Sequence, residues 1–165
     1  MSSAYNPFGL RPAYAPEGVL RTAPQATLVS GYGVTLYLYT PVAIDATGYV
    51  VAAAAGSDAL GTFMGVEFTD ADGRRRYSNK WVAGTVATDI VVWMTLFQMN
   101  YVYEIQANAT LTIAAFGAQY DWTAIAGNLI TGLSSVGLDV ASAAANAGLR
   151  VVGLTPGPDN AWGDA

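Results

Sequence analysis

Short runs of β-branched and aromatic residues, separated by glycine and aspartate, recur along this sequence and constrain its fold more than any other feature. The runs lie at residues 34–39, 45–53, 62–68, 86–94, 101–107, 109–116 and 149–154. Strands that recur about every 8 to 15 residues, with turn residues between them, are typical of an all-β sandwich or barrel. We therefore predict a single mainly β body at residues 31–165, a β-sandwich or β-barrel. Little helix is expected, and the strongest candidate is the alanine-rich stretch at 141–148.

The segment TDADG at residues 69–73 predicts a tight hairpin turn between a strand at 62–68 and a second strand at 74–78. Aspartate and glycine suit the left-handed backbone positions of such turns. A basic cluster follows, made of Arg74, Arg75, Arg76 and Lys80. We expect Asp70 and Asp72 to pair with these cations at a solvated hairpin tip. A calcium site is disfavoured, because the closing glutamate of an EF-hand loop is missing and the arginines would repel a cation.

Residues 1–30 differ from the rest, because four prolines leave no stretch long enough for a helix or a regular sheet. Each proline fixes its own φ and pushes the preceding residue towards extended backbone. We therefore predict an extended, proline-rich N-terminal arm. Its apolar and aromatic side chains are Tyr5, Phe8, Leu10, Tyr14, Val19 and Leu20. Disordered linkers are generally poor in aromatics, so we expect this arm to lie on a surface, either its own body or a partner.

The sequence contains too few charged residues to make the surface of an isolated monomer polar. Apolar residues make up 53% of the 165 residues and charged residues only 12%, whereas about 25% charged residues is usual in soluble domains. Large exposed apolar patches usually mark protein interfaces. We therefore expect an oligomer or a component of an assembly. The net charge of −5 argues against direct binding to nucleic-acid phosphates.

No membrane or export segment is predicted. A spanning helix needs about 20 consecutive apolar residues, and no such run is present. The opening MSSAYNPFGLRP lacks a basic leader followed by an apolar run, so no signal peptide is predicted. We expect a protein that is made in a cytoplasm and contacts no membrane.

The residue inventory argues against an enzyme. Cysteine and histidine are both absent, which removes thiolate nucleophiles, the common zinc ligands and every imidazole-dependent triad. A carboxylate pair could hydrolyse a glycosidic bond, and the candidates are Glu67, Asp89, Glu104 and Asp121. They lie in or beside predicted strands, where alternation makes surface charges the simpler interpretation. No phosphate-binding glycine motif occurs, so we predict no catalytic residues, no metal and no cofactor.

Four tryptophans and ten tyrosines allow a second class of function, a sugar-binding module in which aromatic faces stack on carbohydrate. Trp81, Trp93 and Trp122 lie within or beside strand-like runs. Aromatic residues in such positions are more often anchors of a core or of a protein interface. We therefore favour the core or interface interpretation for these three tryptophans.

Several blocks of the sequence together resemble a family of phage head-decoration, or cement, proteins. The opening NPFGLRP (6–12) resembles the family's "PFGFRP", GTFMGVEF (61–68) resembles "GVFxGVEY", and YEIQA (103–107) resembles "FEIQAD". Further blocks that fit are AAAAG (52–56), the Ser78-x-x-Trp81 pattern, GLS (132–134) and LRVVGL (149–154). The blocks follow the family's order over nearly the whole chain, and this collinearity is the signal.

The resemblance implies a structural virion protein, not an enzyme, that binds the outer surface of a phage capsid and stabilises it. Its partners would be the major capsid protein and further copies of itself, with a trimer expected and a dimer as the alternative. Phe8, Leu10 and Tyr14 would anchor the arm in apolar grooves, and Arg11 would bond to a carboxylate there. A tail or neck structural protein and a virion-surface carbohydrate-binding module are the alternative functions.

Overall fold

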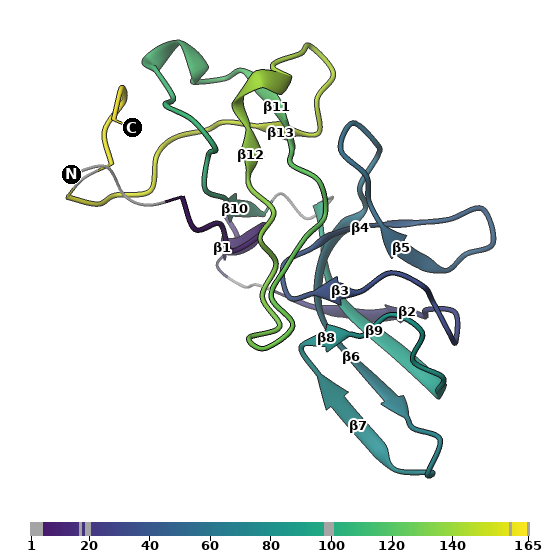
Figure 1. Cartoon of the computed structure of the whole chain (residues 1–165). Coiled ribbons are helices and arrows are strands. Elements are labelled where there is room, and N and C mark those ends of the chain that lie inside the picture. Colours follow the sequence, from purple (N-terminus) through teal and green to yellow (C-terminus); the bar gives the residue numbers. More distant parts are fainter. Residues whose placement is uncertain (1–4, 17, 19–20, 98–100, 159, 165) are drawn as a thin grey trace.

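The computed structural model describes residues 5–16, 18, 21–97, 101–158 and 160–164, and within these ranges it contains short strands and 3-10 turns but no α-helix (Figure 1). The strands are β1 (Arg11–Tyr14), β2 (Ala23–Ala26), β3 (Leu36–Tyr37), β4 (Pro41–Ile44), β5 (Val50–Ala52), β6 (Gly61–Thr69), β7 (Arg75–Ser78), β8 (Lys80–Trp81), β9 (Thr88–Leu96), β10 (Val102–Glu104), β11 (Gln119–Trp122), β12 (Leu138–Asp139) and β13 (Leu149–Arg150). The 3-10 helices are η2 (Ile113–Ala115) and η3 (Val140–Ser142).

The strands pair in several small antiparallel sheets. A six-stranded sheet, called the large sheet here, has the order β2-β9-β6-β4-β5, and β7 pairs with the second half of β6. A three-stranded sheet has the order β12-β11-β13, and the pairs β3-β8 and β1-β10 form two ribbons. No sheet closes on itself among the described residues. The prediction of a mainly β chain with little helix is confirmed.

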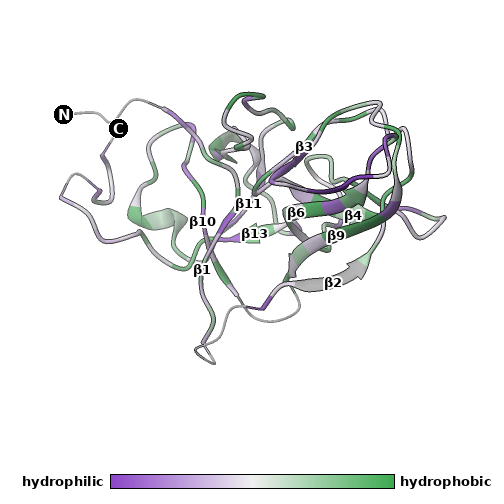
Figure 2. Cartoon of the chain, turned by 90° about the horizontal axis from the view of Figure 1, so that it is seen from below, coloured by the Kyte–Doolittle hydropathy of each residue, from purple (hydrophilic) through white to green (hydrophobic). Residues whose placement is uncertain are grey.

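The main hydrophobic core lies on one face of the large sheet. Figure 2 shows hydrophobic residues concentrated along β4, β6 and β9. Trp81 from the β3-β8 ribbon is fully buried on this face, and its ring meets the Phe68 ring edge-on at 5.5 Å between centroids. A second tryptophan, Trp122 of β11, is buried in a smaller cluster, where its Nε1 donates a hydrogen bond of 3.1 Å to the Ala53 carbonyl.

The central strand β6 is bent by a bulge. It pairs with β9 along its whole length, but the register shifts between Phe63 and Gly65. Gly65 has φ 142°, a conformation that glycine adopts without strain. At the start of β6, Gly61 lies so close to β9 that an added Cβ would stand 2.0 Å from the Thr95 carbonyl oxygen. Glycine at position 61 therefore permits the two strands to approach.

The predicted hairpin after β6 is confirmed. The Asp70 amide donates to the Arg74 carbonyl at 2.9 Å, and Gly73 takes the left-handed φ of 76°. Charge pairing at the tip is confirmed for Asp70, because Arg76 Nε contacts Asp70 Oδ2 at 2.7 Å, whereas the described residues show no ion pair of Asp72. The hydrogen bond from the Arg74 amide, followed by that from Arg76, lowers the pKa of the Asp70 carboxyl.

Three sequence predictions need correction. The strand predicted at 109–116 is wrong: the Ala115 amide bonds back to the Thr112 carbonyl, and the segment forms η2. The helix candidate at 141–148 forms only η3, because the Ala144 amide donates to Gln119 of β11 instead of to its own segment. The strand predicted at 34–39 shortens to β3, because the left-handed φ of 71° at Tyr39 turns the chain.

The arm also contains sheet, which was not predicted. β1 pairs with β10 and β2 pairs with β9, so two segments of the arm join different sheets (Figure 1). Residues 1–4, 17, 19 and 20 of the predicted arm lie outside the described residues.

Within the described residues, no helix is long and apolar enough to cross a membrane.

The approach of β6 to β9 predicts different effects for two glycine substitutions. Gly61→Ala should lower the free energy of unfolding by about 1–3 kcal/mol, because the new methyl group meets backbone that cannot move aside. The matched control is Gly33→Ala, where an added Cβ meets no atom within 4 Å, and its effect should stay within about 0.5 kcal/mol. Urea denaturation measures both, and equal stabilities of the two variants would contradict the assignment.

Candidate binding surfaces

The first part of the arm is fixed to the chain's own body. The Gly9 amide donates to the Val136 carbonyl at 3.1 Å, and the Leu10 amide donates to the Tyr39 carbonyl at 2.9 Å. Gly9 has φ 86°, and an added Cβ would lie 2.6 Å from the Tyr39 oxygen. The Leu10 side chain is 1% exposed. Leu10 therefore packs in the body in this structure, and it could contact a partner only if the arm lifted away.

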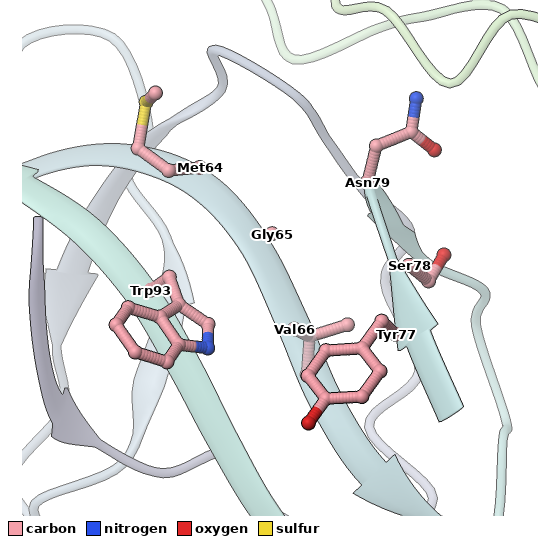
Figure 3. Close-up of a pocket in the computed structure, with 7 residues that line it drawn as sticks. All are labelled: Met64, Gly65, Val66, Tyr77, Ser78, Asn79 and Trp93. Atoms are coloured by element: carbon pink, nitrogen blue, oxygen red, sulfur yellow. The ribbon is translucent and has the colours of Figure 1, made fainter. Parts of the chain in front are cut away.

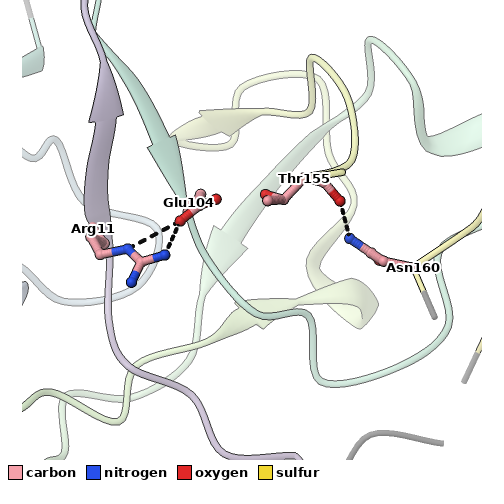
Figure 4. Close-up of polar contacts among 4 residues, drawn as sticks. All are labelled: Arg11, Glu104, Thr155 and Asn160. Carbon is pink, nitrogen blue, oxygen red and sulfur yellow. Dashed lines mark hydrogen bonds and ion pairs between the residues drawn. The ribbon is translucent and has the colours of Figure 1, made fainter. Parts of the chain in front are cut away.

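An ion pair joins the arm to β10. Arg11 lies opposite Glu104 in the antiparallel register, and its Nε donates to Glu104 Oε2 at 3.0 Å, beside a second contact from the same guanidinium (Figure 4). The hydrogen bond from Arg11 lowers the pKa of the Glu104 carboxyl, and the Thr155 hydroxyl adds to this effect. Asn160 in turn donates to the Thr155 carbonyl at 2.7 Å. Glu104 therefore connects the arm, β10 and the C-terminal segment.

The same contacts join two blocks of the sequence, residues 6–12 and 103–107. Arg11 belongs to NPFGLRP and Glu104 to YEIQA. The Asn6 amide also donates to the Gln106 side-chain oxygen at 2.9 Å, again from the first block to the second. Polar residues of both blocks thus hold the arm on the body.

The remaining predicted anchors stay at the surface. Tyr14 at the end of β1 is 57% exposed. Phe8 is half-buried, and the Arg11 guanidinium carbon lies 4.8 Å from the centroid of its ring. A cation stacked on a ring in this way restricts both side chains. The structure therefore brings Phe8 and Arg11 together and separates them from the buried Leu10. Their contact with a partner stays a prediction.

A second surface lies on the outward face of the large sheet, away from the core. It is a shallow hollow of about 340 Å³ (Figure 3). Its lining residues are Met64, Gly65, Val66, Tyr77, Ser78, Asn79 and Trp93. The sequence prediction treated Trp93 like the two other strand tryptophans. Trp81 and Trp122 are buried as predicted for core anchors, whereas Trp93 is only half-buried and lines this hollow.

The alternation along β9 was the signal that could have separated Trp93 from the others. Ile90, Val92 and Met94 are buried in the main core. Successive side chains of a strand point to opposite faces, so a residue between Val92 and Met94 faces outward. The apolar character of Trp93 concealed this, because a large aromatic residue in a strand usually indicates a core position.

The four carboxylates considered for catalysis are each bound within the chain. Glu67 pairs with Arg75, and Glu104 pairs with Arg11. Asp89 accepts from the Thr69 hydroxyl at 3.1 Å, and Asp121 accepts from the Gly148 amide at 2.9 Å. Across the described ranges, no group of three or more acidic residues is arranged to hold a metal ion.

Comparison with known proteins gives no relative for this chain: no family model, no curated protein and no solved structure matches it.

The ion pair between the arm and β10 should stabilise the fold in a pH-dependent way. Because the pKa of Glu104 is lowered in the folded protein, its contribution is present above the pKa of an unfolded carboxyl and is lost as pH falls through the folded value. Arg11 is half-exposed, so the coupling at about pH 7 should not exceed about 1 kcal/mol.

A double-mutant cycle with Arg11→Met and Glu104→Gln, followed by urea denaturation, measures this coupling. The single variants serve as controls for each side chain alone. Coupling that persists undiminished at about pH 2, below the range in which carboxylates ionise, would contradict the ion-pair assignment.

Proposed function

We propose that this chain is a structural virion protein that binds the outer surface of a bacteriophage capsid and stabilises it. The observation that carries the proposal is the β1-β10 ribbon, which holds Tyr14 at 57% exposure on a segment fixed to the body at Gly9, Leu10 and Arg11. An exposed aromatic residue on a rigid support loses little conformational freedom on binding, as an interface anchor requires. Phe8 and Arg11 supply a second, mixed apolar and charged contact beside it.

The resemblance to decoration proteins supports this assignment independently. Its first and third blocks contact each other through Arg11 and Glu104 and through Asn6 and Gln106. Residues that hold the arm in place account for why these blocks occur together in one chain. The assignment to the sandwich class also belongs to this proposal, because the β3-β8 ribbon covers the core face of the large sheet through Trp81.

The surface supports a role in an assembly. Large apolar side chains are exposed at several places, among them Ile130 at 93%, Val86 at 69% and Ile113 at 66%. Only 12% of the residues are charged, so association would cover surface that water solvates poorly. The partners in this proposal are the major capsid protein and further copies of the chain, as a trimer or, alternatively, a dimer. The location is the capsid exterior, after synthesis in the cytoplasm of the host bacterium.

Stabilisation of the capsid would follow from mass action, without catalysis. A protein that binds the assembled shell and not its separated subunits shifts the equilibrium towards the shell in proportion to its occupancy. Many copies, each in contact with neighbouring coat subunits, would add their effects and resist internal pressure. This mechanism requires no metal, cofactor or direct contact with nucleic acid.

Substitution of the exposed arm residue tests the binding surface. Tyr14→Ala should weaken binding to purified phage particles that lack the protein by roughly tenfold or more, as truncation of an interface anchor does. The matched control is Tyr77→Ala, which removes a similarly exposed tyrosine from β7 and should leave binding unchanged. Co-sedimentation with the particles measures both. Equal binding by the two variants would exclude β1 from the interface.

The copy number of the chain in purified particles tests the location. A decoration protein should be present at about one copy per coat subunit, or at a simple fraction that the capsid symmetry sets. Quantitative mass spectrometry of the particles gives this ratio. A handful of copies per particle would instead favour a neck or tail protein, and absence from the particles would refute the virion assignment.

A further inference from the structure

The hollow on the outward face of the large sheet has an aromatic residue on either side of a glycine. Trp93 of β9 lies directly opposite Gly65 of β6 in the sheet register, and Tyr77 of β7 lies opposite Glu67, two residues further along β6. Residues two apart on a strand share a face. Trp93, Gly65 and Tyr77 therefore share the outward face, and the missing side chain at Gly65 leaves the space between the two rings open.

The two rings lie flat rather than on edge. Figure 3 views the outward face, and both the indole of Trp93 and the phenol ring of Tyr77 present a broad face there. Tyr77 is 74% exposed, and Arg75, two residues earlier on β7, lies on the same face of the sheet. Arg75 pairs with Glu67, which is only 8% exposed, and the same guanidinium interacts with the Tyr77 hydroxyl.

The rim of the hollow is polar but uncharged. Ser78 and Asn79 line it, and no residue of the lining carries a formal charge. The Asn79 side-chain amide donates to the Thr131 carbonyl at 3.0 Å, which fixes the amide group. The oxygen of this amide lies against Gly132, away from the two rings. The polar groups beside the rings are the indole N–H of Trp93, on the side of the indole nearer Tyr77, and the Tyr77 hydroxyl (Figure 3). A flat apolar floor with neutral hydrogen-bonding groups at its edge matches a pyranose, which has an apolar C–H face and a rim of hydroxyls.

Size and charge argue against other occupants. A stable protein interface buries about 800 Å² on each partner, far more than this hollow of seven residues offers. Strand addition at the β7 edge is opposed by the exposed arginines Arg74, Arg75 and Arg76, since charges on an edge strand discourage pairing. The volume of about 340 Å³ falls within the range of about 300–1,000 Å³ that small-molecule sites occupy.

We propose that the hollow between Trp93 and Tyr77 binds a neutral oligosaccharide built of pyranose units, with sugar rings stacked on the two aromatic faces and hydroxyls bonded to the Trp93 indole N–H and the Tyr77 hydroxyl. This site is separate from the arm surface and does not depend on the proposed capsid contact. A chain that coats a particle and carries such a site would give the particle many weak contacts with a glycan surface, and their combined avidity would exceed that of a single site.

The test uses the full chain and three probes, which are maltohexaose, cellohexaose and chitohexaose, each titrated to about 10 mM to cover millimolar affinity. The readout is the indole N–H resonance of Trp93, assigned through Trp93→Phe, by NMR. At least one probe should shift this resonance in a saturable way. Tyr77→Ala should weaken that binding roughly two- to tenfold, the worth of one aromatic contact, whereas the control Tyr14→Ala should leave it unchanged.

Three results would overturn the proposal. The first is no saturable shift with any of the three probes. The second is a shift that Tyr77→Ala leaves unaltered, which would place the sugar elsewhere. The third is a change in the sedimentation mass of the chain on Tyr77→Ala, which would make this face a contact between copies. The capsid assay with Tyr14→Ala is independent, so failure of either proposal is recognisable without the other.

Discussion

The antiparallel pairing of β6 with β9 is the interaction on which the rest of this structure depends. These two strands have nine residues each, whereas every other described strand has four or fewer. Their shared inner face carries Phe63, Val66 and Val92 of the main core. Their outer face carries Gly65 and Trp93 of the hollow. Because a strand pair must bury one face to be stable, the short strands around it complete the fold, and the outer face stays free for function.

The arm is held by a different kind of contact. The main core is apolar, but the arm is fixed largely by polar groups: backbone hydrogen bonds at Gly9 and Leu10 and the ion pair of Arg11 with Glu104. The half-exposed ion pair is individually weak, and it determines geometry more than stability. In the proposed function, this geometry matters because it fixes the direction in which Tyr14 meets a partner.

Local signals in the sequence predicted what depends on local physics. The hairpin at 69–73 was predictable because Asp70 and Gly73 satisfy the turn without help from distant residues. The segment at 141–148 was not, because its amides bond to β11 and this partner is set by tertiary structure. The sequence predicted that the apolar arm residues would lie on a surface, but not which of them would be buried. Burial of Leu10 depends on hydrogen bonds from the arm backbone to Tyr39 and Val136, which are far away in sequence. The hollow was not predicted, because it depends on a bulge at Gly65 and on the strands that flank β6. A single glycine in a strand does not indicate that Trp93 and Tyr77 lie on either side of it.

The two strands of the arm lie in different sheets, and this has a mechanical consequence. β1 runs along β10, and β2 runs along β9 in the large sheet. If a coat subunit held the chain at Tyr14, a pull along β1 would act parallel to the strands and stretch the ribbon's hydrogen bonds together instead of one after another. If the β1-β10 pairing broke, the load would pass along the chain to β2. There it would again act parallel to the strands, on the hydrogen bonds between β2 and β9. The arm would then resist extension in two stages, and a shell under tension would be joined to the most strongly paired part of the fold.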